Sequence, residues 1–229
     1  MTEGGQETVA ARIPGAAALG LVVPPSAGLV PATRLADPAW TVGVIGAGRA
    51  DRRVAATLWW YSVSAVLVTP PLAGLVTGVP LSGRLVDTAL AFRADGLPVA
   101  AVSSARGADV AAELRESLAA AVSAVAAAGR MRTRPLWAIA TDSLANRLLE
   151  LGRALRDVPA VTALAAPLAA AIGAPLPVPR YVDVAGARFT RRASCCLVDR
   201  ATGQEMCTSC PRRPPAERAA LLEQAARWF

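Results

Sequence analysis

The alternation of apolar and polar residues along the chain predicts a helix-rich fold. Residues 108–128 are rich in Ala, Leu and Glu, and Gly129 is placed to end a helix there. Residues 137–156 form a second predicted helix, with an apolar face made by Leu144, Leu148, Leu149 and Leu151. These two segments carry the clearest periodicity in the chain.

Three further helices are expected over residues 52–68, 157–172 and 216–229. Asp51 is a good N-cap for the first, and Pro70-Pro71 should end it and start a short helix through residue 75. Prolines punctuate residues 1–40, which we expect to be irregular.

Strands are predicted in two places. Residues 87–92 and 98–102 flank Asp95-Gly96, a dipeptide suited to a hairpin turn, and residues 180–192 read as two short strands around Gly186. The proline-rich connection at 173–179 is the best boundary in the chain. We therefore predict an α+β fold in which a helix-dominated domain with a small hairpin spans residues 1–179, and a C-terminal module spans residues 180–229.

The composition supports a sizeable core, since 54% of residues are hydrophobic and 18% are charged. Residues 54–83 and 158–179 carry no charge and are long enough to span a membrane. Prolines interrupt both stretches, and the second is rich in Ala rather than Leu, Ile or Phe. Buried helices explain them better, with at most peripheral membrane association.

The charges narrow the possible chemistry. The formal net charge is +7, and all 24 basic residues are Arg, so the surface should attract nucleic acid, anionic lipid or acidic proteins. The chain has no His. This excludes a His general base, a His-ligated haem, a Rieske centre and a Cys₂His₂ zinc site. We predict no catalytic acid, base or nucleophile.

Four cysteines near the C-terminus carry the strongest signal: Cys195, Cys196, Cys207 and Cys210. Their spacing is Cys-Cys-x₁₀-Cys-x₂-Cys, and Gly203 gives the intervening loop freedom to fold back. Thiolates are soft ligands that select iron–sulfur clusters, zinc or copper(I). The first residues lack the basic and apolar regions of a secretory signal, so we expect a reducing cytoplasm and metal ligands rather than disulfides.

Spacing alone leaves two metal sites open. A structural Cys₄ zinc site is common, but zinc ribbons use two Cys-x₂-Cys pairs, whereas one pair here is directly adjacent. Neighbouring side chains diverge in extended chain and do not easily reach one metal. A 2Fe–2S cluster gives more latitude, because each neighbour can serve a different iron.

Residues 191–211 are similar to the C-terminal motif of the FhuF-type ferric siderophore reductases, including the full cysteine spacing and the Pro after the last cysteine. Two further stretches resemble family members, namely residues 134–138 (Arg-Pro-Leu-Trp-Ala) and 142–144 (Asp-Ser-Leu). The resemblance implies a 2Fe–2S cluster on the four cysteines and one-electron reduction of a ferric siderophore, with hydroxamates the first choice, in the cytoplasm. A ferredoxin-type protein is the implied electron donor.

Arginines surround the motif and can serve this chemistry. Positive charge near an anionic cluster raises its reduction potential, and a basic face can dock an acidic donor. The candidates for tuning or docking are Arg191, Arg192, Arg200, Arg212 and Arg213.

Other signals are weaker. The aromatic residues Trp59, Trp60, Tyr61 and Trp137 could line a substrate pocket, but their helical spacing favours the core. Residues 43–51 resemble the start of a dinucleotide fingerprint, yet Asp51 stands where the third glycine is needed and no βαβ pattern follows. The rival function is a Cys₄ zinc protein acting on nucleic acid or in regulation. We expect no nucleic-acid partner, because the basic stretch lacks interleaved aromatic residues.

Overall fold

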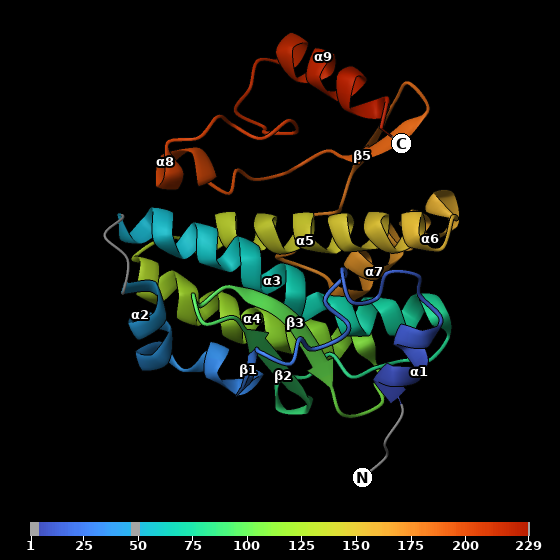
Figure 1. Ribbon diagram of the computed structural model, residues 1–229. Helices are drawn as coiled ribbons and strands as arrows, with labels where there is room; N and C mark the ends of the chain where they lie inside the picture. Colours follow the sequence, from blue (N-terminus) through green and yellow to red (C-terminus); the bar gives the residue numbers. More distant parts are fainter. Residues whose placement is uncertain (1–4, 47–50, 229) are drawn as a thin grey trace.

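The computed structural model describes residues 5–46 and 51–228, and its architecture is the predicted α+β class. Three long helices form the centre: α3 (Arg52–Thr77), α4 (Val110–Gly129) and α5 (Thr133–Ala154). Figure 1 shows α3 and α5 side by side, with α4 and a small sheet on one side of them and the C-terminal segment on the other. The main core lies between these helices.

Helix α3 differs from the prediction, because it runs through Pro70 and Pro71 without ending. Asp51 caps it as expected, accepting a hydrogen bond from the Arg53 N–H at 2.8 Å. Thr69 Oγ1 donates to the Ala65 carbonyl at 2.8 Å, just before the prolines, and the whole stretch from Val66 to Gly74 is buried. Tertiary packing therefore holds a helix that local sequence rules would end.

The predicted hairpin is present. Strands β2 (Thr88–Phe92) and β3 (Pro98–Ser103) pair antiparallel, and Gly96 takes a φ of +79° in the turn. A third strand, β1 (Gly28–Pro31), pairs with β2 in the order β1-β2-β3. The expectation that residues 1–40 are irregular is therefore wrong in part.

The same N-terminal region holds α1 (Gly5–Ala11), the 3-10 helix η1 (Ala32–Ala36) and the start of α2 (Pro38–Gly46). Buried Gln6 ties α1 to the sheet, since its side chain donates to the carbonyl of Ala101 at 2.7 Å and accepts from the N–H of Ser103 at 2.7 Å. These partners lie about a hundred residues away in sequence, which local patterns do not report. The glycine-rich segment considered as a fingerprint is helical to Gly46, and residues 47–50 lie outside the described ones.

Helix α5 begins four residues earlier than predicted, and the helix expected at 157–172 is split into α6 (Val158–Ala163) and α7 (Ala165–Ile172). A short 3-10 helix, η2 (Leu85–Asp87), precedes the hairpin. Helix α4 matches the prediction, with its N-cap at Asp109.

The C-terminal segment begins with the predicted pair of short strands, β4 (Tyr181–Val184) and β5 (Ala187–Thr190), which turn at Gly186. Helix α8 (Val198–Thr202) was not predicted, and α9 (Pro215–Ala226) was. A small hydrophobic cluster of its own joins β5 to α9, made of Ala187, Phe189, Leu222 and Ala226. Figure 1 shows this segment lying over α3 and α5. The domain boundary at residue 179 stays a prediction.

Among the described residues, α3 alone is long and apolar enough to cross a membrane by length and composition, and 67% of its most apolar window is buried inside the protein. It lies at the centre of the helical layer, where α4, α5 and the sheet cover it.

Candidate metal centre

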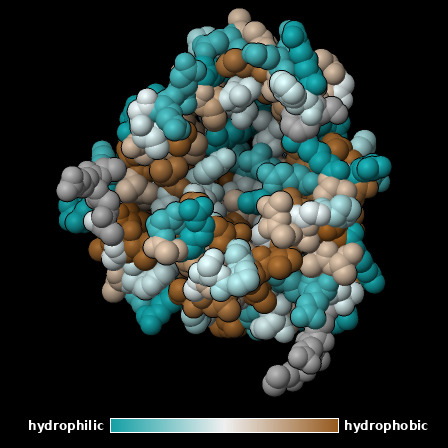
Figure 2. All heavy atoms as spheres, in the orientation of Figure 1, coloured by the Kyte–Doolittle hydropathy of each residue, from teal (hydrophilic) through white to brown (hydrophobic). Residues whose placement is uncertain are grey.

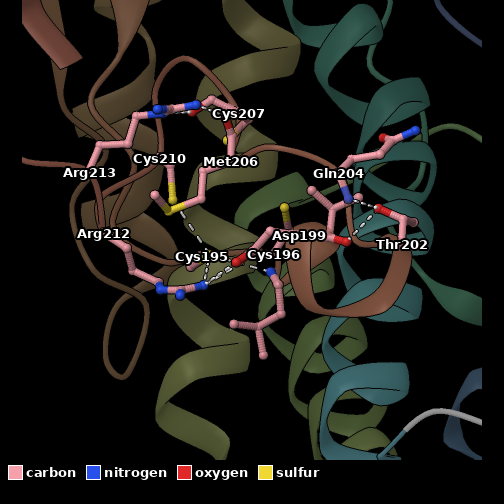
Figure 3. A network of polar contacts seen from close by, with 12 residues as sticks. Cys195, Cys196, Asp199, Thr202, Gln204, Met206, Cys207, Cys210, Arg212 and Arg213 are labelled. Carbon is pink, nitrogen blue, oxygen red and sulfur yellow. Dashed lines mark hydrogen bonds and ion pairs between the residues drawn. The ribbon is translucent and has the colours of Figure 1, made fainter. Parts of the chain in front are cut away.

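The four cysteines lie on a loop that leaves β5, turns through α8 and returns before α9. Figure 3 shows them gathered at the base of this loop, between α8 and the arginines that follow the last cysteine. Cys196 and Cys210 are buried, while Cys195 and Cys207 are half-buried. All four are free thiols in the structure.

The thiols meet in two pairs. The Sγ atoms of Cys195 and Cys210 are 3.7 Å apart, and the Sγ atoms of Cys196 and Cys207 both contact Arg192 Nη1, at 3.8 and 3.2 Å. No group of three or more His, Cys, Asp or Glu side chains suited to one metal ion occurs in residues 5–46 and 51–228. Two thiolates on one tetrahedral ion, with metal–sulfur bonds of about 2.3 Å, would lie about 3.8 Å apart. The arrangement thus fits two metal ions with two sulfur ligands each.

The backbone after Cys196 separates the two neighbouring cysteines. Leu197 adopts a left-handed conformation with φ +60°, and α8 starts directly after it. The Leu197 N–H donates to Cys195 Sγ at 3.4 Å. Backbone N–H bonds to sulfur stabilise negative charge on the thiolates.

A buried carboxylate on α5 anchors the start of the cysteine loop. Asp142 is 1% exposed, and its two carboxylate oxygens accept the N–H groups of Ala193 and Ser194 at 2.7 and 3.0 Å. Its Oδ2 also lies 3.5 Å from Nε of Arg192. Burial raises the pKa of Asp142, and the two backbone N–H bonds and Arg192 oppose that shift. Asp142 therefore fixes the loop against the helical body immediately before Cys195.

Arg192 reaches from that anchor to the sulfurs. Its Nη1 lies 3.2 Å from Cys207 Sγ and 3.8 Å from Cys196 Sγ, and its guanidinium carbon lies 5.0 Å from the centre of the Tyr61 ring. Burial acts to lower the pKa of Arg192, but electrostatic interactions with Tyr61, the two cysteines and Asp142 outweigh it and raise the pKa overall. The guanidinium stays charged in the interior.

The thiol pKa values follow from these contacts. The pKa of Cys196 falls to about 5, first because Cys207 donates a hydrogen bond to it, with burial acting the other way and Arg192 and the Val198 N–H adding to the fall. The pKa of Cys207 rises because its thiol is that donor and is itself partly buried. Burial also raises the pKa of Cys195. Loading a metal requires the raised thiols to give up their protons.

The other candidate arginines are placed differently. Arg212 Nη1 lies 3.8 Å from Cys195 Sγ and donates to both carboxylate oxygens of Asp199, at 2.8 and 3.1 Å (Figure 3). Arg213 donates to the carbonyls of Cys207 and Met206 and pairs with Glu217, so it shapes the loop. Arg191 and Arg200 are exposed, and within the described part of the chain no hydrogen bond or ion pair links their side chains to a cysteine.

Two residues of the site escaped sequence reasoning, namely Asp142 and Tyr61 as partners of Arg192. The aromatic candidates for a pocket belong mainly to the core. Trp60 and Trp137 are 0% and 5% exposed, and Trp60 Nε1 donates to the Leu136 carbonyl at 2.8 Å. Trp59 packs edge-on against Trp40, with ring centres 5.9 Å apart.

Two cavities involve the C-terminal segment. The larger, of about 700 Å³, opens between the end of α5, α6 and the β4–β5 turn. Its lining includes Arg153, Arg156, Arg188, Asp183 and Trp228. The smaller, of about 220 Å³, is lined by Arg191, Arg192, Arg218, Ser209 and Pro211 beside the cysteines. Figure 2 shows the surface hollowed between the C-terminal segment and the helical body, with hydrophilic side chains along the hollow.

The donor set fits a 2Fe–2S cluster. It offers four thiols in two pairs, backbone N–H donors to sulfur and a buried cation, and its neighbouring cysteines serve different pairs. A single zinc ion would need all four thiols around one point.

Comparison with known proteins agrees with this chemistry. The model of the FhuF 2Fe-2S C-terminal domain matches residues 192–212, which run from the buried arginine to two residues past the last cysteine. No curated protein and no solved structure matches the chain. The cysteine loop of this chain thus matches the FhuF 2Fe-2S C-terminal domain, and this match supports a 2Fe–2S cluster on its cysteines.

Proposed function

We propose that the protein is a cytoplasmic ferric siderophore reductase. The observation that carries this proposal is the FhuF-type cysteine loop, with its two thiol pairs docked on the helical body. The domain is associated with siderophore-iron reduction, and the chain offers no His for acid–base chemistry. A reaction that moves one electron needs neither a general base nor a nucleophile.

The chemistry follows from the preferences of iron. Fe(III) is a hard cation, which oxygen donors such as hydroxamates hold far more tightly than Fe(II). When bound, the 2Fe–2S cluster accepts and releases one electron at a time. A reduced ferredoxin-type donor would lose one electron and the chelated Fe(III) would gain it, after which the siderophore releases Fe(II).

The 700 Å³ cavity is the best candidate for the substrate site. Its size suits a small-molecule chelate. Exposed Arg156 at the rim can donate to the oxygen atoms of a chelate, and exposed Trp228 offers an apolar surface. Arg188 lines this cavity, and Arg192 touches the thiols four residues further on. Their Cα atoms are at most about 14 Å apart, even in a fully extended chain.

The basic rim of the loop supports the proposed donor. Arg191 and Arg200 are exposed on the cysteine side, where they can attract an acidic ferredoxin. Their charges would act on the association rate and its salt dependence more than on the chemistry.

Anaerobic mixing tests the proposal. The protein is reduced with dithionite, freed of excess reductant, and mixed with a ferric hydroxamate in the presence of an Fe(II) chelator. We expect the ferric complex to bleach in proportion to the protein, with Fe(II) appearing in the chelator. The same protein without iron and sulfide is the control, and bleaching no faster than with this cluster-free protein would contradict the proposal.

Metal analysis of the same preparation distinguishes the 2Fe–2S cluster from a zinc site. Iron and inorganic sulfide in equal amounts, with visible absorption and an EPR signal after reduction, are expected. A colourless protein that contains zinc would support a Cys₄ structural site instead.

A further inference from the structure

We propose that Arg192 tunes the cluster and directs the added electron to the metal held by Cys196 and Cys207. The inference rests on the 2Fe–2S cluster and is independent of the identity of the substrate. Three observations carry it: the burial of Arg192, its one-sided position against the thiol pairs, and its unpaired donors.

Burial strengthens the electrostatic effect of the Arg192 guanidinium on the thiols. Arg192 is 8% exposed, and its ion-pair partner Asp142 is 1% exposed, so water screens neither of them well. The Arg212 side chain is 38% exposed, and both oxygens of Asp199 face its Nη1. Of these two arginines, which both contact a cysteine sulfur, Arg192 is the one whose charge acts through the poorly screened interior.

The position of Arg192 favours one of the two thiol pairs. Arg192 Nη1 lies 3.2 Å from Cys207 Sγ and 3.8 Å from Cys196 Sγ, the two members of one pair. The Cys195–Cys210 pair receives its guanidinium contact from screened Arg212. An electron that enters an anionic centre is stabilised most on the side nearest to unscreened positive charge. The donor protein loses that electron, and the Cys196–Cys207 side gains it.

The unpaired donors show that the site is incomplete with protein atoms alone. Nε and Nη2 of Arg192 are buried; among the described residues Nη2 has no hydrogen-bond acceptor, and Nε has only the 3.5 Å ion-pair contact with Asp142 Oδ2. Buried guanidinium groups rarely lack acceptors, because an unmade bond costs their full desolvation energy. Asp142 meets only part of this need, since its Oδ2 lies 3.5 Å from Nε and Nη2 is left without a partner. Sulfur atoms of a bound cluster are acceptors of the kind that is missing.

Redox titration of the holoprotein tests the tuning, with midpoint potentials read from EPR of samples at fixed potentials. Arg192→Gln should disfavour reduction at least tenfold, which is a fall of about 59 mV for one electron. Arg192→Lys keeps the charge and should stay within threefold of wild type. The matched control Arg212→Gln should also stay within threefold. Equal shifts in Arg192→Gln and Arg212→Gln, or an unchanged potential in Arg192→Gln with normal cluster content, would overturn the proposal.

Mössbauer spectra of ⁵⁷Fe-labelled, reduced protein test the direction, and they remain decisive if Arg192→Gln fails to load a cluster. Cys207→Ser and Cys210→Ser each replace one sulfur by oxygen in one pair. Cys207→Ser should change the ferrous doublet, and Cys210→Ser should change the ferric one. The opposite result would place the electron on the other side. Neither readout uses a siderophore, so failure of the proposed reductase activity would leave both tests standing.

Discussion

At the scale of single residues, Asp142 links the helical body to the metal centre. Its carboxylate accepts the two N–H groups that precede Cys195 and faces Arg192, all in the protein interior. The sequence shows only that Asp142 is an acidic residue in a predicted helix. The structure shows that its neighbours Ile139 and Leu149 are buried. A charge on an apolar helix face needs a partner, and here the partner comes from 50 residues further along.

Asp142→Asn should therefore destabilise the protein by about 3 kcal/mol, the range for breaking a buried ion pair. The amide leaves Arg192 without its counter-charge and presents an N–H₂ group to one of the backbone donors. Chemical denaturation of the anaerobic holoprotein measures the loss, and cluster content should fall with it.

Asp183→Asn is the matched control. Asp183 pairs with Arg188 at 2.8 Å, but its side chain is 60% exposed, so solvent screens the pair. A change of less than about 1 kcal/mol is expected there. If both variants lost the same stability, Asp142 would not be an anchor.

The ligand set could be predicted from the sequence, since the cysteines and their spacing are local. The choice among the five arginines could not. Arg192 and Arg212 differ by burial and by their acidic partners, which only the folded chain sets. Tyr61 reaches Arg192 from α3, more than a hundred residues away.

At the scale of elements, the long helices were predictable because their periodicity is local. Helix α3 shows where that reasoning fails. Proline removes a backbone donor and normally ends a helix, yet α3 continues for six residues beyond Pro71. Burial on several sides outweighs the local cost. Strand β1 was not predicted because its pairing with β2 joins residues about sixty positions apart, which local patterns do not report.

The end of α3 also depends on a close approach of the backbone. A Cβ atom on Gly74 would lie 2.6 Å from the Leu81 nitrogen and 2.7 Å from the Val79 oxygen. Gly74→Ala should therefore cost about 2 kcal/mol of stability, as overpacking does. Thermal or chemical unfolding measures it.

Gly43→Ala provides the comparison for this variant. Gly43 also lies in a helix, and nothing occupies the space within 4 Å of its added Cβ. Alanine is the better helix former, so a gain of about 0.5 kcal/mol is expected. A loss of stability in Gly43→Ala as large as that in Gly74→Ala would show that steric contact is not the cause.

At the scale of the whole molecule, the helical body and the C-terminal segment each have a hydrophobic cluster, and a cavity lies between them. The overall class was predictable, whereas the docking of the cysteine loop on α5 was not. No local pattern specifies which helix a distant loop will contact.

The cavity yields a kinetic prediction. Arg156→Gln removes a rim donor without touching the cysteines, so KM for the ferric chelate should rise about tenfold while kcat stays within twofold. Arg130→Gln is the control, because Arg130 is equally exposed, also has a positive φ, and is not part of the cavity lining. A fall in kcat with unchanged KM would argue against binding at this cavity.

Helix α5 carries Asp142 near its middle, and Arg153 from its last turn lines the cavity. Eleven residues of α-helix separate them, or about 17 Å along the axis. Helix α5 thus sets the distance between the proposed chelate cavity and the anchor of the cysteine loop. Because electron tunnelling falls steeply with distance, the fixed length of α5 would limit how fast the cluster can pass its electron to a chelate in the cavity.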